Sequence, residues 1–425
     1  MEDCKKRDFW FLYAIIGLMV FVSGSAWGAS LAELQDQAVA NRKIVEKYRL
    51  DLQKGELDEK IIKGRFLPSL NLNYTANQLD EDGAFEQSEN SAMTGSVSYN
   101  IFSGFRDTYD LKSAELVRQS KDYELGAIVQ DIRYAVVASY LNIFGRKNHL
   151  TVAEDEYKLL QKRYEDSQDQ YQVGLIRKND VLKIKVELDN AEQQLKTAET
   201  ELMKSVNQIA YDTNSQVSLS SLSFSEFSQL PKVKDFGFYE ARMSERRNEI
   251  KTLGMLLAAQ ENAVKSARAA YYPRVDVSGS YKQYGNNYAL GQGDEDENEM
   301  RLQLQVNMNL FDGFSKDHVL SKSELDVKRI QHDLSELKQS LGTDLKNTLL
   351  DYAVSEKNLK VAESSILQAE ENFRITDVSF KEGVETTADV LDAIFYLSRA
   401  KYNVINARNK LFLDYYRLLR ITDDL

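Results

Sequence analysis

Two hydrophobic patterns alternate along this chain. In the first, apolar and polar residues follow each other with a period of two, which is typical of β-strands. In the second, long proline-free stretches repeat apolar residues every three or four positions, as at Leu125, Ile128 and Ile132, which predicts amphipathic helices. The period-two segments lie at about 68–78, 92–102, 274–284 and 299–310. The chain therefore combines a few short strands with much longer helices.

The long helices are predicted over 105–172 and 314–381. At 1.5 Å per residue, each would be about 100 Å long. Tip segments at 174–180 and 383–389 follow them, because Gly174 and Gly383 favour helix ends. A return helix is predicted after each tip. One further helix is predicted before each strand pair, from Ser30 to about Arg65 and over 238–272.

The same order of predicted elements occurs twice along the chain. "SVSYNIFSGF" at 96–105 matches "QVNMNLFDGF" at 305–314, and "VGLIRKNDVL" matches "EGVETTADVL" at the same offset of 209 residues. Both long arms span 70 residues, from Gly104 to Gly174 and from Gly313 to Gly383. Equal arms indicate a structural duplication. The repeats are predicted at 29–211 and 238–425, with a Ser-rich linker at 212–237 between them.

The first 28 residues have the pattern of a signal peptide. A basic start precedes an apolar run from Phe9 to Val22, which at 14 residues is too short for a span of about 20. Small residues follow, so cleavage is predicted after Gly28; an uncleaved anchor is the alternative. The single cysteine, Cys4, precedes the apolar run. The mature chain is therefore expected to have no disulfide and no lipid anchor.

The composition argues against several classes of function. The net charge of -12 argues against a nucleic-acid partner, and the 28% of charged residues suits long solvated helices. The three histidines are scattered, and we find no metal motif, no nucleophile beside a base and no phosphate-binding loop. We therefore expect neither an enzyme nor a cofactor.

The pattern of the strands indicates that they span a membrane. Each has one apolar face, and the sequence offers no second sheet to cover it. The length fits a transmembrane barrel strand of roughly 9–11 residues. Lipid does not tolerate open sheet edges, and known barrels begin at about eight strands. The chain must then pool its strands with two, three or four copies in a ring. A soluble β-subdomain capping a coiled coil is the alternative.

The repeated order of helix, two strands, long helix, glycine tip and return helix resembles the TolC family of outer-membrane channels. The resemblance covers essentially the whole mature chain, and its most specific marks are "NIFSGF", "NLFDGF" and the two tip motifs. It implies an α+β membrane protein that forms a homotrimer. Four transmembrane strands per chain would build a 12-stranded barrel in outer-membrane lipid, continuing into a periplasmic α-helical coiled-coil barrel.

The resemblance also implies a function and partners. The protein would be the passive exit duct of a tripartite efflux pump or a type I secretion system. Its partners would be a periplasmic adaptor and an inner-membrane transporter of RND or ABC type. The rival hypothesis is a periplasmic coiled-coil scaffold or adaptor with a small β-head, which would be soluble without detergent. The acidic loops at 80–89 and 294–298 are expected to face the outside.

Site residues follow from the same resemblance. The pair in "DVLD", Asp389 and Asp392, would form acidic rings in the periplasmic aperture, together with Asp180, Phe380 and Glu385. Asp180 and Asp389 also begin helices, where a carboxylate offsets the macrodipole. Glu385 occupies the position of an arginine that closes some family members, and it cannot pair with Asp180. Arg177 is the candidate substitute.

The resemblance implies two further sets of site residues, one at the tip and one at the base of the barrel. The adaptor would contact the tip at Gly174, Leu175, Gly383 and Val384. The base of the barrel would carry an interfacial girdle. Its members are Phe102, Gly104, Phe105, Phe311, Gly313 and Phe314. Ser103 and Asp312 precede the long helices and are predicted as N-caps.

Overall fold

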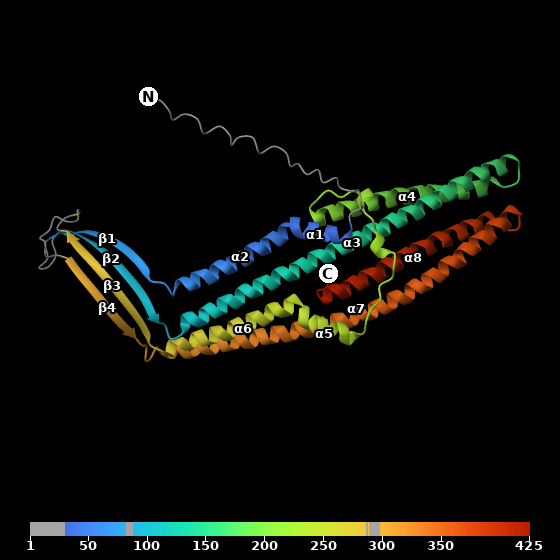
Figure 1. The fold of residues 1–425 in the computed structure, drawn as a ribbon. Helices are drawn as coiled ribbons and strands as arrows, with labels where there is room; N and C mark the ends of the chain where they lie inside the picture. The colour runs from blue at the N-terminus through green and yellow to red at the C-terminus, as the bar shows by residue number, and fades with distance from the viewer. Residues whose placement is uncertain (1–29, 82–87, 286–287, 289–297) are drawn as a thin grey trace, which may run out of the picture.

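A computed structural model gives the structure of the chain and describes residues 30–81, 88–285, 288 and 298–425 (Figure 1). The expected signal peptide and most of the two acidic loops lie outside these residues. The first repeat contains α1 (Leu31–Asn41), α2 (Lys43–Gly64), β1 (Ser69–Gln78), β2 (Glu89–Phe102), α3 (Arg106–Gln172) and α4 (Lys178–Thr213). The second contains α5 (Phe236–Arg246), α6 (Asn248–Arg268), β3 (Arg274–Gly285), β4 (Asn298–Asn307), α7 (Ser315–Lys381) and α8 (Thr387–Ile421).

The strands form one antiparallel four-stranded sheet in the order β1-β2-β3-β4. Its register separates an apolar face from a polar one. One row across the sheet consists of Leu70, Val97, Gly279 and Leu302, and the next of Leu72, Gly95, Tyr281 and Met300. The row between them consists of Asn71, Ser96, Ser280 and Arg301. Apolar side chains and glycines therefore gather on one face, where Leu70 lies beside Val97 and Tyr281 lies beside Met300.

Among the described residues, no other element covers either face of the sheet. The sheet lies at one end of the molecule, beyond the helices (Figure 1). On the edge strand β4, Met300 is 88% exposed and Leu302 is 84% exposed. Both edges, β1 and β4, lack a neighbouring strand within the described chain. An exposed apolar sheet with two free edges is unstable in water and is a template for pairing with another chain.

The helices continue the order of the strands. α2 packs on α3, α3 on α6 and α6 on α7, so the layer beneath the sheet repeats the order β1 to β4 (Figure 1). Among the described residues, no helix has both the length and the apolar composition needed to cross a bilayer. The layer is open, with α2 and α7 at its two sides. Only tertiary packing along such seams stabilises long helices of this kind.

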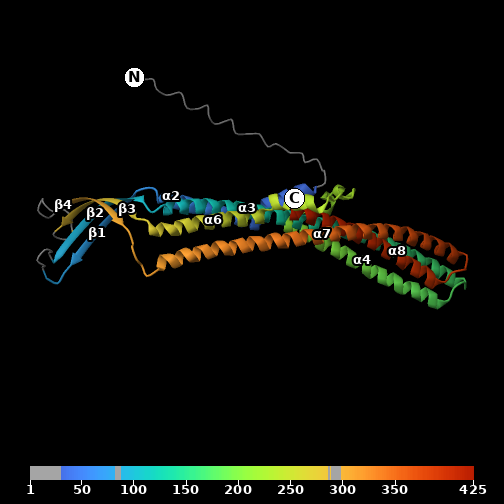
Figure 2. The ribbon, with the colours of Figure 1, turned by 90° about the horizontal axis from the view of Figure 1, so that it is seen from below.

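Two coiled hairpins form the other end. α3 returns as α4 and α7 returns as α8, and both hairpins reach the end opposite the sheet (Figure 2). Near the tips, Leu160, Leu188, Val390 and Ile394 pack in one buried cluster from both hairpins. The C-terminus lies back at the middle of the molecule (Figure 1). The two hairpins are thus joined by an apolar core inside one chain.

The single helices expected before each strand pair are both broken, so this expectation was wrong. α1 and α2 separate at Arg42, which has an extended backbone, and α5 and α6 separate at Arg247, which leaves the helical region with φ -54° and ψ 115°. The Arg42 guanidinium donates to the carbonyl of Tyr211 at 3.1 Å, and that of Arg247 donates to the carbonyl of Arg420. Each arginine therefore caps the end of a return helix. A one-residue break leaves the hydrophobic period nearly unchanged, so the sequence pattern does not indicate the break.

The Ser-rich linker packs tightly on the middle of α3, around Tyr140 and Phe144, which we call the waist of the molecule. Phe224 and Phe227 lie against Tyr140 and Phe144, with ring centroids 4.8–5.6 Å apart. The Phe224 backbone N–H also donates to the Tyr140 hydroxyl at 3.0 Å. Aromatic contacts at such distances add about 0.5–1.5 kcal/mol beyond burial. Phe227 also lies against Phe412 of α8, with ring centroids 5.0 Å apart, so the linker contacts both repeats.

Gly145, in the middle of α3, allows α8 to approach closely. The helix runs through it without interruption, and a Cβ there would overlap the amide of Asn409. We expect Gly145→Ala to cost about 1–3 kcal/mol of overpacking, against the gain of about 1 kcal/mol that alanine brings to a helix. Thermal unfolding of the detergent-solubilised protein measures the change. The control is Gly254→Ala in α6, where nothing lies within 4 Å of the new Cβ, and it should not destabilise.

Candidate functional site

The two tips are built alike. Gly174 and Gly383 have positive φ angles of 78° and 75°, which glycine adopts at little cost. The N–H of Leu175 bonds to the carbonyl of Gln170 at 2.8 Å, and that of Val384 to the carbonyl of Ser379 at 2.9 Å. These bonds close a Schellman motif at each helix end. Leu175 and Val384 are about three-quarters exposed, at 74% and 77%, so both tips present an apolar side chain to the surroundings.

Asp389 has a local structural role beside any role in an aperture. Its carboxylate accepts from the backbone N–H and the hydroxyl of Thr386 at 2.9 and 2.6 Å, completing a capping box. These hydrogen bonds lower the pKa of Asp389. The neighbouring carboxylate of Asp389 raises the pKa of Glu385. Asp389 therefore keeps its charge at a lower pH than Glu385 does.

The other predicted aperture residues lie apart within one chain. Asp392 is exposed one turn after Asp389, on the same side of α8. Asp180 pairs with Lys183 of its own helix at 3.8 Å. Arg177, the expected substitute for the closing arginine, is exposed and makes no ion pair within the described part of this chain. The five aperture candidates share one end of the molecule. Glu385 and Asp389 are neighbours, but the set does not form one cluster in a single chain.

One buried contact between the two hairpins has no local signal in the sequence. Arg163 of α3 forms a buried ion pair with Asp377 of α7, and its guanidinium lies 5.2 Å from the centroid of the Phe380 ring. Lys381 adds a second cation to Asp377 at 2.7 Å. Burial opposes ionisation of Asp377, but hydrogen bonds from Lys381 and Arg163 lower its pKa. We call Arg163, Asp377, Phe380 and Lys381 the tip clamp.

The base of the sheet turns into the long helices through aromatic corners. Phe102 and Phe105 meet edge to face with centroids 5.1 Å apart, and Phe311 and Phe314 do so at 5.4 Å. Phe105, Phe311 and Phe314 are mostly exposed. Phe105 and Phe314 have positive φ angles of 68° and 66°, a conformation that is uncommon for a bulky residue.

The caps at these corners differ slightly from the prediction. Phe105 and Phe314 occupy the formal N-cap positions. The side chains of Ser103 and Asp312 still accept first-turn N–H groups, from Asp107 at 3.3 Å and Lys316 at 3.1 Å. Both glycines have positive φ, and at Gly104 a Cβ would also lie 2.7 Å from the carbonyl oxygen of Ala269. Gly104 is therefore required for space as well as for conformation.

A duplicated chain with an uncovered sheet at one end and paired helical hairpins at the other has the architecture of an outer-membrane channel subunit. The family model "Outer membrane efflux protein" matches residues 34–211 and 242–422, and the chain belongs to that family. It is thus an outer-membrane protein that extends into the periplasm. It is 23% identical to the outer membrane protein TolC of Vibrio cholerae, over 96% of this chain and 93% of that protein.

Solved structures show the same fold. CusC superposes with a TM-score of 0.81 at 13% identity, covering 92% of this chain and 91% of that one. The outer-membrane channel CmeC of Campylobacter jejuni gives 0.80 at 13% identity, covering 93% and 85%. VceC of Vibrio cholerae gives 0.79 at 15% identity, covering 92% and 95%. The TolC-family resemblance and the expected fold class are confirmed.

Proposed function

We propose that this chain is the exit duct of a tripartite efflux pump or a type I secretion system. Three copies form a passive channel, which a periplasmic adaptor and an inner-membrane transporter open at the tip. The observation that carries the proposal is the bare four-stranded sheet, apolar on one face and polar on the other, with both edges free. Three such sheets supply twelve strands, which is enough to close a barrel.

The helices support the same assembly. Under the free edge of β1, helix α2 exposes Leu50, Leu57 and Ile61, which follow each other at heptad-like spacing. Under the free edge of β4, helix α7 exposes a matching series. Its members are Val319, Leu325, Leu350, Val354, Val361, Leu367, Ile375 and Val378. We infer that α7 of one copy packs on α2 of the next copy. Nearer the tips, it packs on α4 of that same neighbouring copy, where Leu182 and Val186 are exposed.

The tip supplies the gate of this duct. In a trimer, exposed Asp389 and Asp392 would each form a ring of three carboxylates around the axis, which favours cations. The tip clamp joins the α3/α4 hairpin to the α7/α8 hairpin and holds Phe380 in place. Leu175 and Val384 give the adaptor an apolar contact on each hairpin. Docking there would favour a splayed state only if the adaptor binds that state more tightly.

Replacing Asp389 and Asp392 together with asparagine tests the gate. Asparagine can still accept a hydrogen bond at the helix start, so the fold should persist. We expect the cation-to-anion permeability ratio in planar bilayers to fall about tenfold, because six charges leave the narrowest point. The matched control is Asp166→Asn, an exposed position of α3 outside the aperture set, and it should leave the ratio unchanged. Unchanged selectivity in the double variant would remove the acidic rings from the mechanism.

A further inference from the structure

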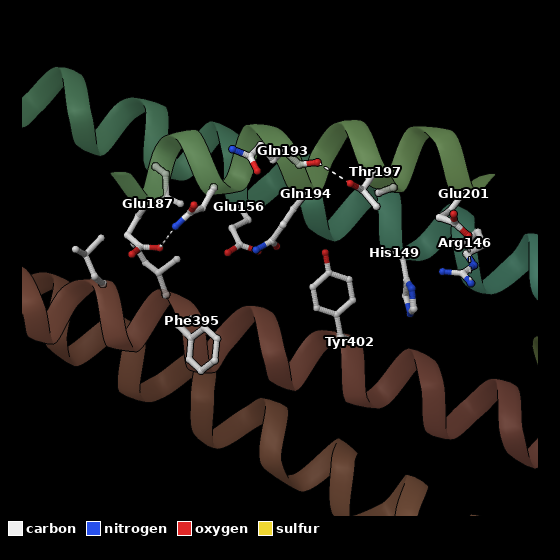
Figure 3. Close-up of a pocket in the computed structure, with 15 residues that line it drawn as sticks. Arg146, His149, Glu156, Glu187, Gln193, Gln194, Thr197, Glu201, Phe395 and Tyr402 are labelled. Atoms are coloured by element: carbon white, nitrogen blue, oxygen red, sulfur yellow. Dashed lines mark hydrogen bonds and ion pairs between the residues drawn. The ribbon is translucent and has the colours of Figure 1, made fainter. Parts of the chain in front are cut away.

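A cavity in the helical half is not used by the duct mechanism. It has a volume of about 560 Å³ and opens between the return helices α4 and α8, with α3 as its floor (Figure 3). Cavities of roughly 300–1,000 Å³ hold drug-sized molecules. We call it the return-helix groove. It lies between the tip clamp and the waist.

The groove carries two carboxylates without a cation. Glu156 rises from the floor and Glu187 from the α4 wall (Figure 3). Neither forms an ion pair with any residue in the described part of the chain. Glu187 accepts a long hydrogen bond of 3.4 Å from Asn190, and the Ser398 hydroxyl lies close enough to Glu156 to lower its pKa. The groove's own cation, Arg146, is already paired with Glu201 at 3.6 Å. The groove is therefore electronegative.

Glu156 is poorly solvated. Burial raises its pKa, the nearby Glu187 raises it further, and the Ser398 hydroxyl lowers it. Nearby Lys401 also lowers this pKa, but the Lys401 ammonium pairs with Asp155 at 3.5 Å. A half-buried carboxylate in this position gains from a cation that enters the groove, because their attraction is screened less than at the surface.

The opposite wall is aromatic. Tyr402 projects from α8 toward α4 and the two carboxylates, and the Phe395 ring lies beside α8 at the edge of the groove (Figure 3). Burial raises the pKa of Tyr402 to about 12, so the ring remains a neutral phenol at physiological pH. Aromatic faces beside carboxylates are the combination that recognises organic ammonium groups. A metal ion fits less well, since the described residues contain no group of three or more His, Cys, Asp or Glu placed to hold one.

The groove stays open in the proposed trimer. At about 100° per residue, Leu182 and Val186 lie on the side of α4 opposite its buried residues Ile184 and Leu188. Glu187 lies between these two sides, whereas Gln193, eleven residues after Leu182, lies on the Leu182 side and forms the outer rim of the groove. A neighbouring copy seated on Leu182 and Val186 would therefore flank the groove without filling it.

We propose that the return-helix groove binds small organic cations that carry an apolar or aromatic body. Glu156 and Glu187 hold the charge, and Phe395 and Tyr402 hold the body. A bound cation joins α4 to α8 and so braces the two hairpins against each other. This site goes beyond the duct function, and it can be measured without any transport.

Benzyltrimethylammonium is a suitable probe, because it joins a permanent charge to one ring and partitions little into detergent. Calorimetric titration of the detergent-solubilised full-length protein is expected to show saturable binding, with a Kd of about 0.1–1 mM. Glu156→Gln and Glu187→Gln should each weaken binding about tenfold. Glu192→Gln, an exposed glutamate of α4 outside the groove, is the matched control and should bind as the wild type does. The uncharged analogue benzyl alcohol should not bind.

Two results would overturn the proposal. One is saturable binding that the Glu156→Gln/Glu187→Gln double variant retains in full while its oligomeric mass and circular dichroism match the wild type. The other is no saturable binding of benzyltrimethylammonium to the wild type. If an arginine-bearing helical peptide binds the groove instead, the groove belongs to a protein partner.

Discussion

Replacing Leu302 and Leu304 with arginine is expected to abolish assembly in the membrane. Both side chains lie on the apolar face of β4, and both are exposed in the single chain, at 84% and 64%. An arginine on the lipid face of a barrel costs about 2–4 kcal/mol at the bilayer midplane. Two in each of three copies cost about 12–24 kcal/mol, which matches or exceeds the typical stability of a folded domain, about 5–15 kcal/mol. Carbonate-resistant protein in the membrane fraction should disappear.

The control uses the next residue of the same strand. Gln303 points to the polar face, where it is paired with Ser278. Gln303→Arg adds the same side chain to the water-facing side and should assemble normally. If the Leu302→Arg/Leu304→Arg variant reached the membrane fraction as well as Gln303→Arg does, the apolar face would not be the lipid face.

Removing the guanidinium of the tip clamp should open the channel. Arg163 and Asp377 are largely buried, with 9% and 19% of their side chains exposed, so solvent screens their pairing little. Hydrogen bonds to charged groups contribute about 1.5–3 kcal/mol, which corresponds to a tenfold to hundredfold change in an equilibrium. Arg163→Ala should therefore raise the open probability of single channels in planar bilayers by about that factor.

Two comparisons sharpen this test. Arg374→Ala removes an exposed arginine of α7 that pairs with Glu371 of the same helix, so it should not change gating.

The pKa of Asp377 is lowered in the folded chain, so the clamp is intact above the ordinary value of 3.8 and is lost only as the pH falls below it. Closure should thus persist between about pH 5 and 8. A wild-type channel that opens on acidification within that range, or an unchanged Arg163→Ala channel, would contradict the clamp.

Local patterns were enough to predict the elements that depend on local rules. The strands were visible because one face is apolar and the other polar, which imposes a period of two. The helix ends at Gly174 and Gly383 were visible because few other residues adopt a positive φ there. Equal arm lengths then indicated the duplication, and the resemblance to a known family supplied the fold class.

What the sequence did not predict depends on contacts between distant segments. The break at Arg42 depends on the carbonyl of Tyr211, which is 169 residues away. Arg163 and Asp377 are 214 residues apart, and each is an ordinary charged residue on a charged helix. The positive φ of Phe105 follows from the corner it makes with Gly104. A single sequence carries no local signal for any of these pairings.

The number of copies in the purified particle tests the central claim most directly. Four strands with two free edges cannot close alone, so the chain needs further copies, and the proposed trimer supplies twelve strands. Native mass spectrometry of the detergent-solubilised protein should therefore give a mass of three chains. A stable single chain, folded and soluble once detergent is removed, would contradict the account and favour a periplasmic scaffold instead.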